Sequence, residues 1–132
     1  IDLVAKRGIA DKFHFPGFMR GKQVQEMLAM SDVYIMPSVS EPFGISPLEA
    51  MQVGCPSIIS HQSGCAEILQ HAIKTDYWDI DAMADAIYAI VKYPAMYKSL
   101  HELGMAEVNN IKWSDAGLKV RRIYDGVINH TL

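Results

Sequence analysis

The chain has 132 residues, 50% of them hydrophobic, and a formal net charge of −3 at pH 7 from 12 basic and 15 acidic residues. This composition supports one globular core and excludes a disordered or fibrous chain, and the absence of a basic run argues against a nucleic-acid partner. No apolar run approaches the roughly 18 residues of a membrane span, and two cysteines give no disulfide framework, so we expect a cytoplasmic protein.

The first two thirds of the chain alternate short apolar runs with amphipathic helical patterns, which is typical of a parallel sheet covered by helices. The predicted strands are Lys12–Phe15, Val33–Met36, Ser57–Ser60 and Ala72–Thr75. Val24, Met27 and Leu28 recur with helical spacing and predict a helix over Gly21–Met30. The predicted fold class is therefore α/β, a Rossmann-like parallel sheet with flanking helices.

A second helix is predicted over Pro47–Val53 from its end signals. Ser46 resembles an N-cap, Pro47 suits the first helical position, and Glu49 completes a capping box. Gly54 follows where a left-handed residue ends many helices. These signals place Glu49 in the first turn of the helix.

The last third of the chain is predicted to be helical. After a short helix at Ala66–Gln70, Asp79 and Asp81 mark the first turn of a helix that runs through Val91. Its predicted apolar face comprises Ile80, Met83, Ala84, Ile87, Ile90 and Val91. Two more helices are predicted, Ala95–Asn109 and a closing one to about Asn129, the latter capped by Ser114 with Trp113 packed against Leu118. Without a linker or repeat, residues 1–132 form a single domain.

Two acids, Glu41 and Glu49, bracket the segment E-P-F-G-I-S-P-L-E. Gly44 has no Cβ, so the backbone N–H groups of Gly44 and Ile45 can approach a phosphate next to a helix start. Carboxylates on either side would then hold hydroxyl groups of the same ligand. The pattern favours a phosphorylated, polyhydroxylated ligand such as a nucleotide sugar. The simpler alternatives are a capping role for Glu49 and a solvated loop position for Glu41.

Several segments resemble the retaining glycosyltransferases of the GT-B fold, the group 1, family-four type. They are S-D-V-Y-I-M-P-S-V-S-E-P-F-G-I-S-P-L-E-A-M-Q-V-G-C-P-S-I-I-S at 31–60, F-H-F-P-G-F at 13–18, Glu67, and Trp113 with Ser114. The resemblance covers nearly the whole chain. It implies the later part of a C-terminal, donor-binding domain, which serves transfer of a hexose from a nucleotide diphosphate sugar to a hydroxyl acceptor without a metal or other cofactor.

The resemblance also implies roles for individual residues. Glu41 is expected to be the catalytic residue, against the transferred sugar, and Glu49 to bind the ribose hydroxyls. The donor sugar and phosphates are expected to contact Phe43, Gly44, Ile45 and Ser46, although core packing is a simpler role for Phe43. The region near the nucleobase is expected to comprise Gly17, Phe18 and Met19, for which packing under a loop is the alternative.

The resemblance begins late in the donor domain, so the upstream basic pair and the N-terminal acceptor domain are expected to be missing partners. The 132-residue chain alone is therefore expected to be inactive. The strands at Phe13 and Tyr34 should either pair directly or have their edges covered by self-association. Two other functions remain open, a nucleotide-sugar epimerase of the same architecture and a non-catalytic module that docks through its helical third. The sequence specifies neither the base, the sugar nor the acceptor, and leaves peripheral membrane contact undecided.

Overall fold

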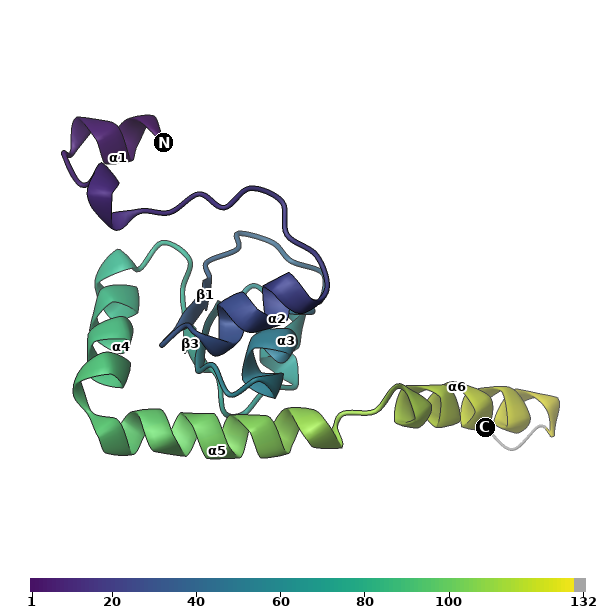
Figure 1. Ribbon diagram of the computed structural model, residues 1–132. Coiled ribbons are helices and arrows are strands. Elements are labelled where there is room, and N and C mark those ends of the chain that lie inside the picture. The colour runs from purple at the N-terminus through teal and green to yellow at the C-terminus, as the bar shows by residue number, and fades with distance from the viewer. Residues whose placement is uncertain (130–132) are drawn as a thin grey trace.

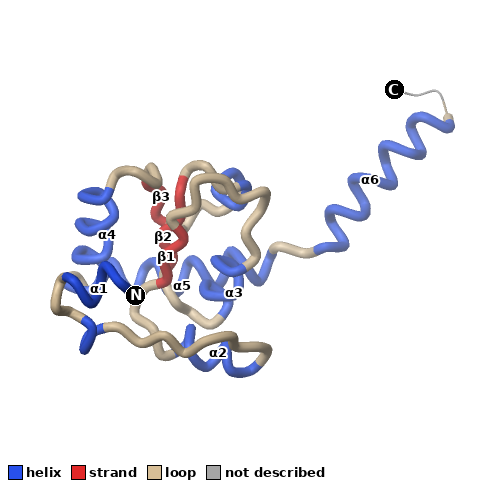
Figure 2. The backbone as a smooth tube through the Cα atoms, turned by 90° about the horizontal axis from the view of Figure 1, so that it is seen from above, coloured by secondary structure: helices blue, strands red, loops and turns tan. Residues whose placement is uncertain are grey.

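The computed structural model in Figures 1 and 2 describes residues 1–129; His130, Thr131 and Leu132 lie outside the described residues. Its sheet has three parallel strands in the order β1 (Tyr34–Met36), β2 (Ser57–Ser60) and β3 (Ile73–Thr75). In the register, Ile58 lies opposite Ile35 on one side and Ile73 on the other. The predicted α/β class and the last three predicted strands are confirmed.

Helices surround this small sheet on both faces. The α-helices of the described residues are α1 (Asp2–Lys6), α2 (Lys22–Ala29), α3 (Ser46–Gln52), α4 (Ile80–Lys92), α5 (Pro94–Asn110) and α6 (Trp113–Ile128), and the 3₁₀ helices are η1 (Ala10–Lys12) and η2 (Gly64–Glu67). Figure 2 shows α4 on one side of the sheet and α3 with α2 on the other. Helix α5 contacts both α3 and α4, and α6 projects away from the body in both views. None of the helices described combines the length and apolar composition needed to cross a bilayer.

Helix α3 is held between two buried clusters. Met51 packs with Met36, Ile59 and Leu69 in the first, and Ala50 packs with Leu28 and Cys55 in the second. Tyr34 packs against both. Fully burying one such aliphatic side chain stabilises a fold by about 1.5–3 kcal/mol. The position of α3, and of the loop that enters it, is therefore fixed by the core.

The predicted strand at Lys12–Phe15 is wrong. Residues 10–12 form η1, residues 13–20 have no regular structure, and Phe13 and Phe15 are exposed. A strand needs a hydrogen-bonded neighbour, and none of the three strands described lies beside this segment. Direct pairing of this segment with β1 is therefore also wrong, whereas cover of the open β1 edge by a second copy stays a prediction.

The predicted capping box of α3 is wrong. The N-cap is Ile45, Ser46 is already the first helical residue, and no side chain of the described residues caps this end. The Tyr34 hydroxyl instead donates a hydrogen bond to Ser46 Oγ at 2.7 Å. Glu49 does lie in the first turn. At the other end, Gly54 adopts the predicted left-handed conformation with φ of 83°.

The helical third is confirmed, with three corrections. The short helix predicted at Ala66–Gln70 is η2, at Gly64–Glu67. The N-cap of α4, Asp79, accepts a hydrogen bond from the Ala82 amide at 2.9 Å. Of the predicted apolar face of α4, Ile90 is buried but Ile80, Ala84 and Val91 are exposed. Helix α6 begins at Trp113 with Lys112 as N-cap, so Ser114 does not cap it. Trp113 therefore lies inside the helix and is 81% exposed. The predicted packing against Leu118 would need Trp113 to stand before the N-cap, which it does not.

Candidate functional site

The loop that joins β1 to α3 leaves the carboxyl end of the sheet, where open parallel sheets usually bind ligands. It is attached to the loop that follows β2. The Gly64 amide donates to the Glu41 carbonyl at 2.9 Å, and the Cys65 amide donates to the Phe43 carbonyl at 2.7 Å. Glu41 and Ser63 also form a parallel bridge. These backbone bonds fix the position of Glu41 relative to the sheet.

Gly64 makes this attachment possible, which sequence reasoning did not foresee. A Cβ at Gly64 would collide with the Pro42 carbonyl oxygen and lie 3.1 Å from the Phe43 Cα. Both are backbone groups, which cannot turn aside as a flexible side chain does. No local pattern around Gly64 signals this close approach, because the backbone that it meets belongs to the loop after β1.

Gly44 is required for two reasons. Its φ is 88°, a conformation that residues with a side chain rarely adopt. A Cβ there would also lie 2.9 Å from the Met36 Cε and 3.1 Å from the Glu41 Cγ. Within residues 1–129, the backbone amides of Gly44, Ile45 and Ser46 have no hydrogen-bond acceptor. Three consecutive free donors at one turn are suited to an anion.

The two predicted carboxylates have different surroundings. Glu41 is half-buried, and its Oε1 lies 3.4 Å from the Phe43 amide nitrogen. Glu49 is exposed and lines a groove of about 660 Å³ between α3, the end of α5 and the start of α6. Phe43 and Ile45 line the same groove, but Glu41 does not. The described residues therefore do not enclose both carboxylates in one groove.

The other predicted site residues lie outside this groove. Ser46 is half-buried beneath the loop, where its hydroxyl bonds to Tyr34. Gly17, Phe18 and Met19 belong to the irregular segment before α2, and the exposed Phe18 ring lies 4.8 Å from the Arg20 guanidinium carbon. Within residues 1–129, no group of three His, Cys, Asp or Glu side chains is arranged to hold a metal ion.

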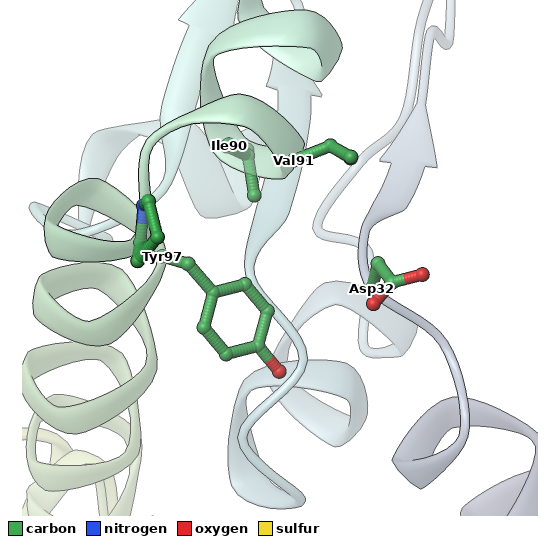
Figure 3. Close-up of a pocket in the computed structure, with 5 residues that line it drawn as sticks. Asp32, Ile90, Val91 and Tyr97 are labelled. Carbon is green, nitrogen blue, oxygen red and sulfur yellow. The ribbon is translucent and has the colours of Figure 1, made fainter.

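A smaller pocket of about 290 Å³ lies at the amino end of β1, opposite Glu41 (Figure 3). It is lined by Asp32, Ile90, Val91, Pro94 and Tyr97.

Burial, and secondarily the charge of Asp32, raises the pKa of the Cys55 thiol to about 11. A thiol that stays protonated at neutral pH is a poor nucleophile. We assign no chemistry to this end of the sheet.

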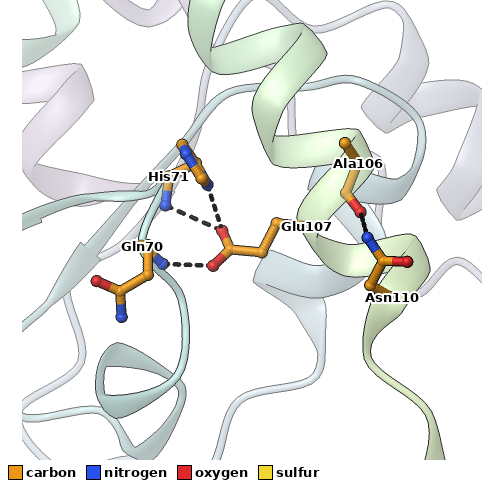
Figure 4. A network of polar contacts seen from close by, with 5 residues as sticks. All are labelled: Gln70, His71, Ala106, Glu107 and Asn110. Atoms are coloured by element: carbon orange, nitrogen blue, oxygen red, sulfur yellow. Dashed lines mark hydrogen bonds and ion pairs between the residues drawn. The ribbon is translucent and has the colours of Figure 1, made fainter.

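A polar network ties α5 to the chain before β3 (Figure 4). The Glu107 carboxylate, 13% exposed, accepts hydrogen bonds from the Gln70 amide at 2.7 Å and the His71 amide at 2.9 Å. Its Oε2 also lies 3.1 Å from the His71 Nδ1. Burial raises the pKa of Glu107, but these contacts outweigh it and hold the pKa below its ordinary value of 4.5.

We expect Glu107→Gln to lower the free energy of unfolding by about 2 kcal/mol at pH 7, because an amide cannot accept all three contacts. The pKa of Glu107 is lower in the folded chain than in the unfolded chain. Its carboxylate therefore stabilises the fold fully above the unfolded pKa, and this contribution is lost as the pH falls through the folded pKa. Urea denaturation should show that the difference in free energy of unfolding between wild type and variant narrows below pH 4.5. A difference that is constant from pH 7 to pH 3 would contradict this role.

The fold is a parallel α/β sheet with flanking helices, and comparison with known proteins identifies the family to which it belongs. Residues 1–106 match the family model described as glycosyl transferases group 1. The chain belongs to this family.

Individual relatives are similar over most of this chain. It is 33% identical over 106 residues to the N-acetyl-alpha-D-glucosaminyl L-malate synthase of Bacillus anthracis, and this match covers 77% of this chain and 27% of that protein. It is 22% identical over 129 residues to the mannosylfructose-phosphate synthase of Agrobacterium fabrum, which covers 95% and 28%. The structure of sucrose-phosphate synthase from Thermosynechococcus elongatus superposes with a TM-score of 0.81 at 26% identity, covering 98% of this chain and 33% of that one. The chain thus spans about a third or less of each relative's length.

Proposed function

We propose that this chain is the donor-binding part of a retaining, metal-independent glycosyltransferase that moves a hexose from a nucleotide diphosphate sugar to a hydroxyl acceptor. The observation that carries the proposal is the turn at 44–46, at the carboxyl end of the sheet, where three consecutive amides have no acceptor among residues 1–129. A diphosphate supplies the negative oxygen atoms that such donors need. Membership of the group 1 glycosyltransferases supports the same donor class.

In this proposal, the loop and its two acids each bind a different part of the donor. The amides of Gly44, Ile45 and Ser46 bind the diphosphate, and the Glu41 carboxylate faces the hexose. Positive charge develops at the anomeric carbon during transfer, and a carboxylate held in place stabilises it without forming a lasting bond. Fixing Glu41 through the bridge to Ser63 reduces the reorganisation needed at that moment.

Glu49 is proposed to hold the ribose. Its carboxylate is exposed and takes no part in capping α3, so both oxygens remain available. Two neighbouring hydroxyls of a ribose can donate to one carboxylate in a bidentate arrangement. Because the Ser46 hydroxyl is already engaged by Tyr34, Ser46 would contribute its backbone amide.

The remaining contacts in the proposal come from other segments. Phe43 borders the donor sugar, and Gly17, Phe18 and Met19 lie near the nucleobase. The acceptor would bind to a domain that these residues do not include, so the 132-residue chain alone is expected to be inactive. The named relatives are synthases of different sugar conjugates, which disfavours the epimerase and the non-catalytic module. We place the enzyme in the cytoplasm.

Glu49→Ala tests the proposal. Removing a carboxylate that accepts two hydroxyl hydrogen bonds is expected to weaken nucleotide-sugar binding at least about 10-fold. Calorimetric titration of UDP-, GDP- and ADP-glucose and GDP-mannose into the native polypeptide that contains this sequence measures the change. Glu102→Ala, at an exposed position of α5, is the matched control and should bind as wild type. Equal affinity of Glu49→Ala and wild type would refute the ribose role. A wild type that binds none of these donors would favour the interaction module.

A further inference from the structure

Two side chains of β1 support the turn at 44–46 from below. Tyr34 and Met36 are two residues apart, so both point to the same face of the sheet, the one that carries α3. The Tyr34 hydroxyl donates to Ser46 Oγ at 2.7 Å, and Ser46 Oγ in turn lies 3.9 Å from the Met36 Sδ. The Met36 Cε lies next to Gly44, and a Cβ added to Gly44 would be only 2.9 Å from it. The turn is therefore held at both of its ends.

The bond from Tyr34 also changes what Ser46 does. A serine at a helix start usually accepts a hydrogen bond from an amide two or three residues further on. Here the Leu48 and Glu49 amides bond to the Ile45 carbonyl, at 2.9 Å and 3.1 Å, and the Ser46 side chain points down to Tyr34. Within residues 1–129, the amides of Gly44, Ile45 and Ser46 have no acceptor, so the Ser46 hydroxyl lies next to donors that are available to a ligand.

We propose that Tyr34 is a positioning residue for the donor diphosphate: through Ser46 it sets the direction in which the amides of the turn point. The inference rests on the proposed function, because it assigns a support to the same site. Tyr34 is suited to this role because its ring packs against both core clusters and has little freedom to move. Its hydroxyl bonds to Ser46 from beneath the loop, so it acts through Ser46 and not on the ligand.

Tyr34→Phe removes one oxygen atom and leaves the packed ring. Losing one partly buried hydrogen bond that orients the turn is expected to weaken binding of nucleoside diphosphates about 3- to 10-fold. Affinity for the corresponding nucleoside, which has no phosphate, should not change. Calorimetry with UDP, GDP and ADP and with uridine, guanosine and adenosine, on the native polypeptide, gives both values. Tyr97→Phe, which removes a hydroxyl at the opposite end of the sheet, is the matched control.

A double-mutant cycle with Ser46→Ala separates positioning from a general structural effect. If Tyr34 acts through Ser46, the double variant should bind diphosphates no more weakly than the weaker single variant. The inference is overturned if the two losses multiply, if Tyr34→Phe binds diphosphates as wild type does, or if it loses nucleoside and diphosphate affinity equally. A wild type that binds no nucleoside diphosphate would overturn the proposed function and this inference together, whereas the preceding outcomes leave the proposed function standing.

Discussion

Glu41→Gln is expected to lower the turnover number of the native transferase by about 10²- to 10³-fold, the usual cost of removing a group that stabilises charge in the transition state. Glutamine preserves the shape of the side chain, the hydrogen bond from the Gly64 amide to the Glu41 carbonyl and the bridge to Ser63, but it removes the negative charge. Because the charge is needed chiefly when the anomeric carbon becomes cationic, KM for the donor should change little. Initial rates at varied donor concentration separate the two parameters.

The control for this experiment is Glu102→Gln, which removes an exposed carboxylate on α5 far from the loop in sequence. It should leave both kinetic parameters unchanged. If Glu41→Gln keeps the wild-type turnover number, the negative charge has no part in the transfer step. If only KM rises, Glu41 binds the ground state of the donor and does not stabilise the transition state.

Gly64→Ala is expected to lower the free energy of unfolding by about 2–3 kcal/mol and to abolish donor binding. The new Cβ would collide with the Pro42 carbonyl, so the loop that carries Glu41 must leave its place on the loop after β2. That movement breaks the hydrogen bonds that the Gly64 and Cys65 amides donate to the Glu41 and Phe43 carbonyls. Thermal unfolding and donor titration report the two effects separately.

Gly117→Ala is the opposing control, since it introduces the same methyl group where nothing lies within 4 Å. Gly117 is inside α6, so alanine there should raise the stability by up to about 1 kcal/mol. A Gly64→Ala variant with wild-type stability and wild-type donor affinity would show that the contact between the two loops is not needed.

The parts of the fold that the sequence predicted well are those decided by local apolar patterns. Strand β2 is predicted to the residue because S-I-I-S is buried on both faces and bounded by Pro56 and His61. Helix α2 and the left-handed Gly54 follow in the same way from spacing and from a glycine after the last helical turn. The family signature predicts a candidate site on the loop after β1, and the roles of its residues stay a prediction.

The features that were missed depend on contacts between residues far apart in the chain. Ser46 has the local signal of a cap, but a tyrosine twelve residues upstream takes its hydroxyl. Lys12–Phe15 has the composition of a strand but lacks a neighbour in the described sheet. The need for glycine at 64 comes from the Pro42 backbone, which no pattern around Gly64 encodes. Such pairings become visible only once the strands are placed.

The most direct test of the central claim is a titration of the ¹⁵N-labelled 132-residue chain with UDP, GDP and ADP, followed by amide chemical shifts. If the turn after β1 binds the diphosphate, the largest shifts should appear at the Gly44, Ile45 and Ser46 amides, and inorganic pyrophosphate should move the same signals. Shifts confined to α6 or to the pocket around Tyr97, with the signals at 44–46 unmoved by every nucleotide, would contradict the account.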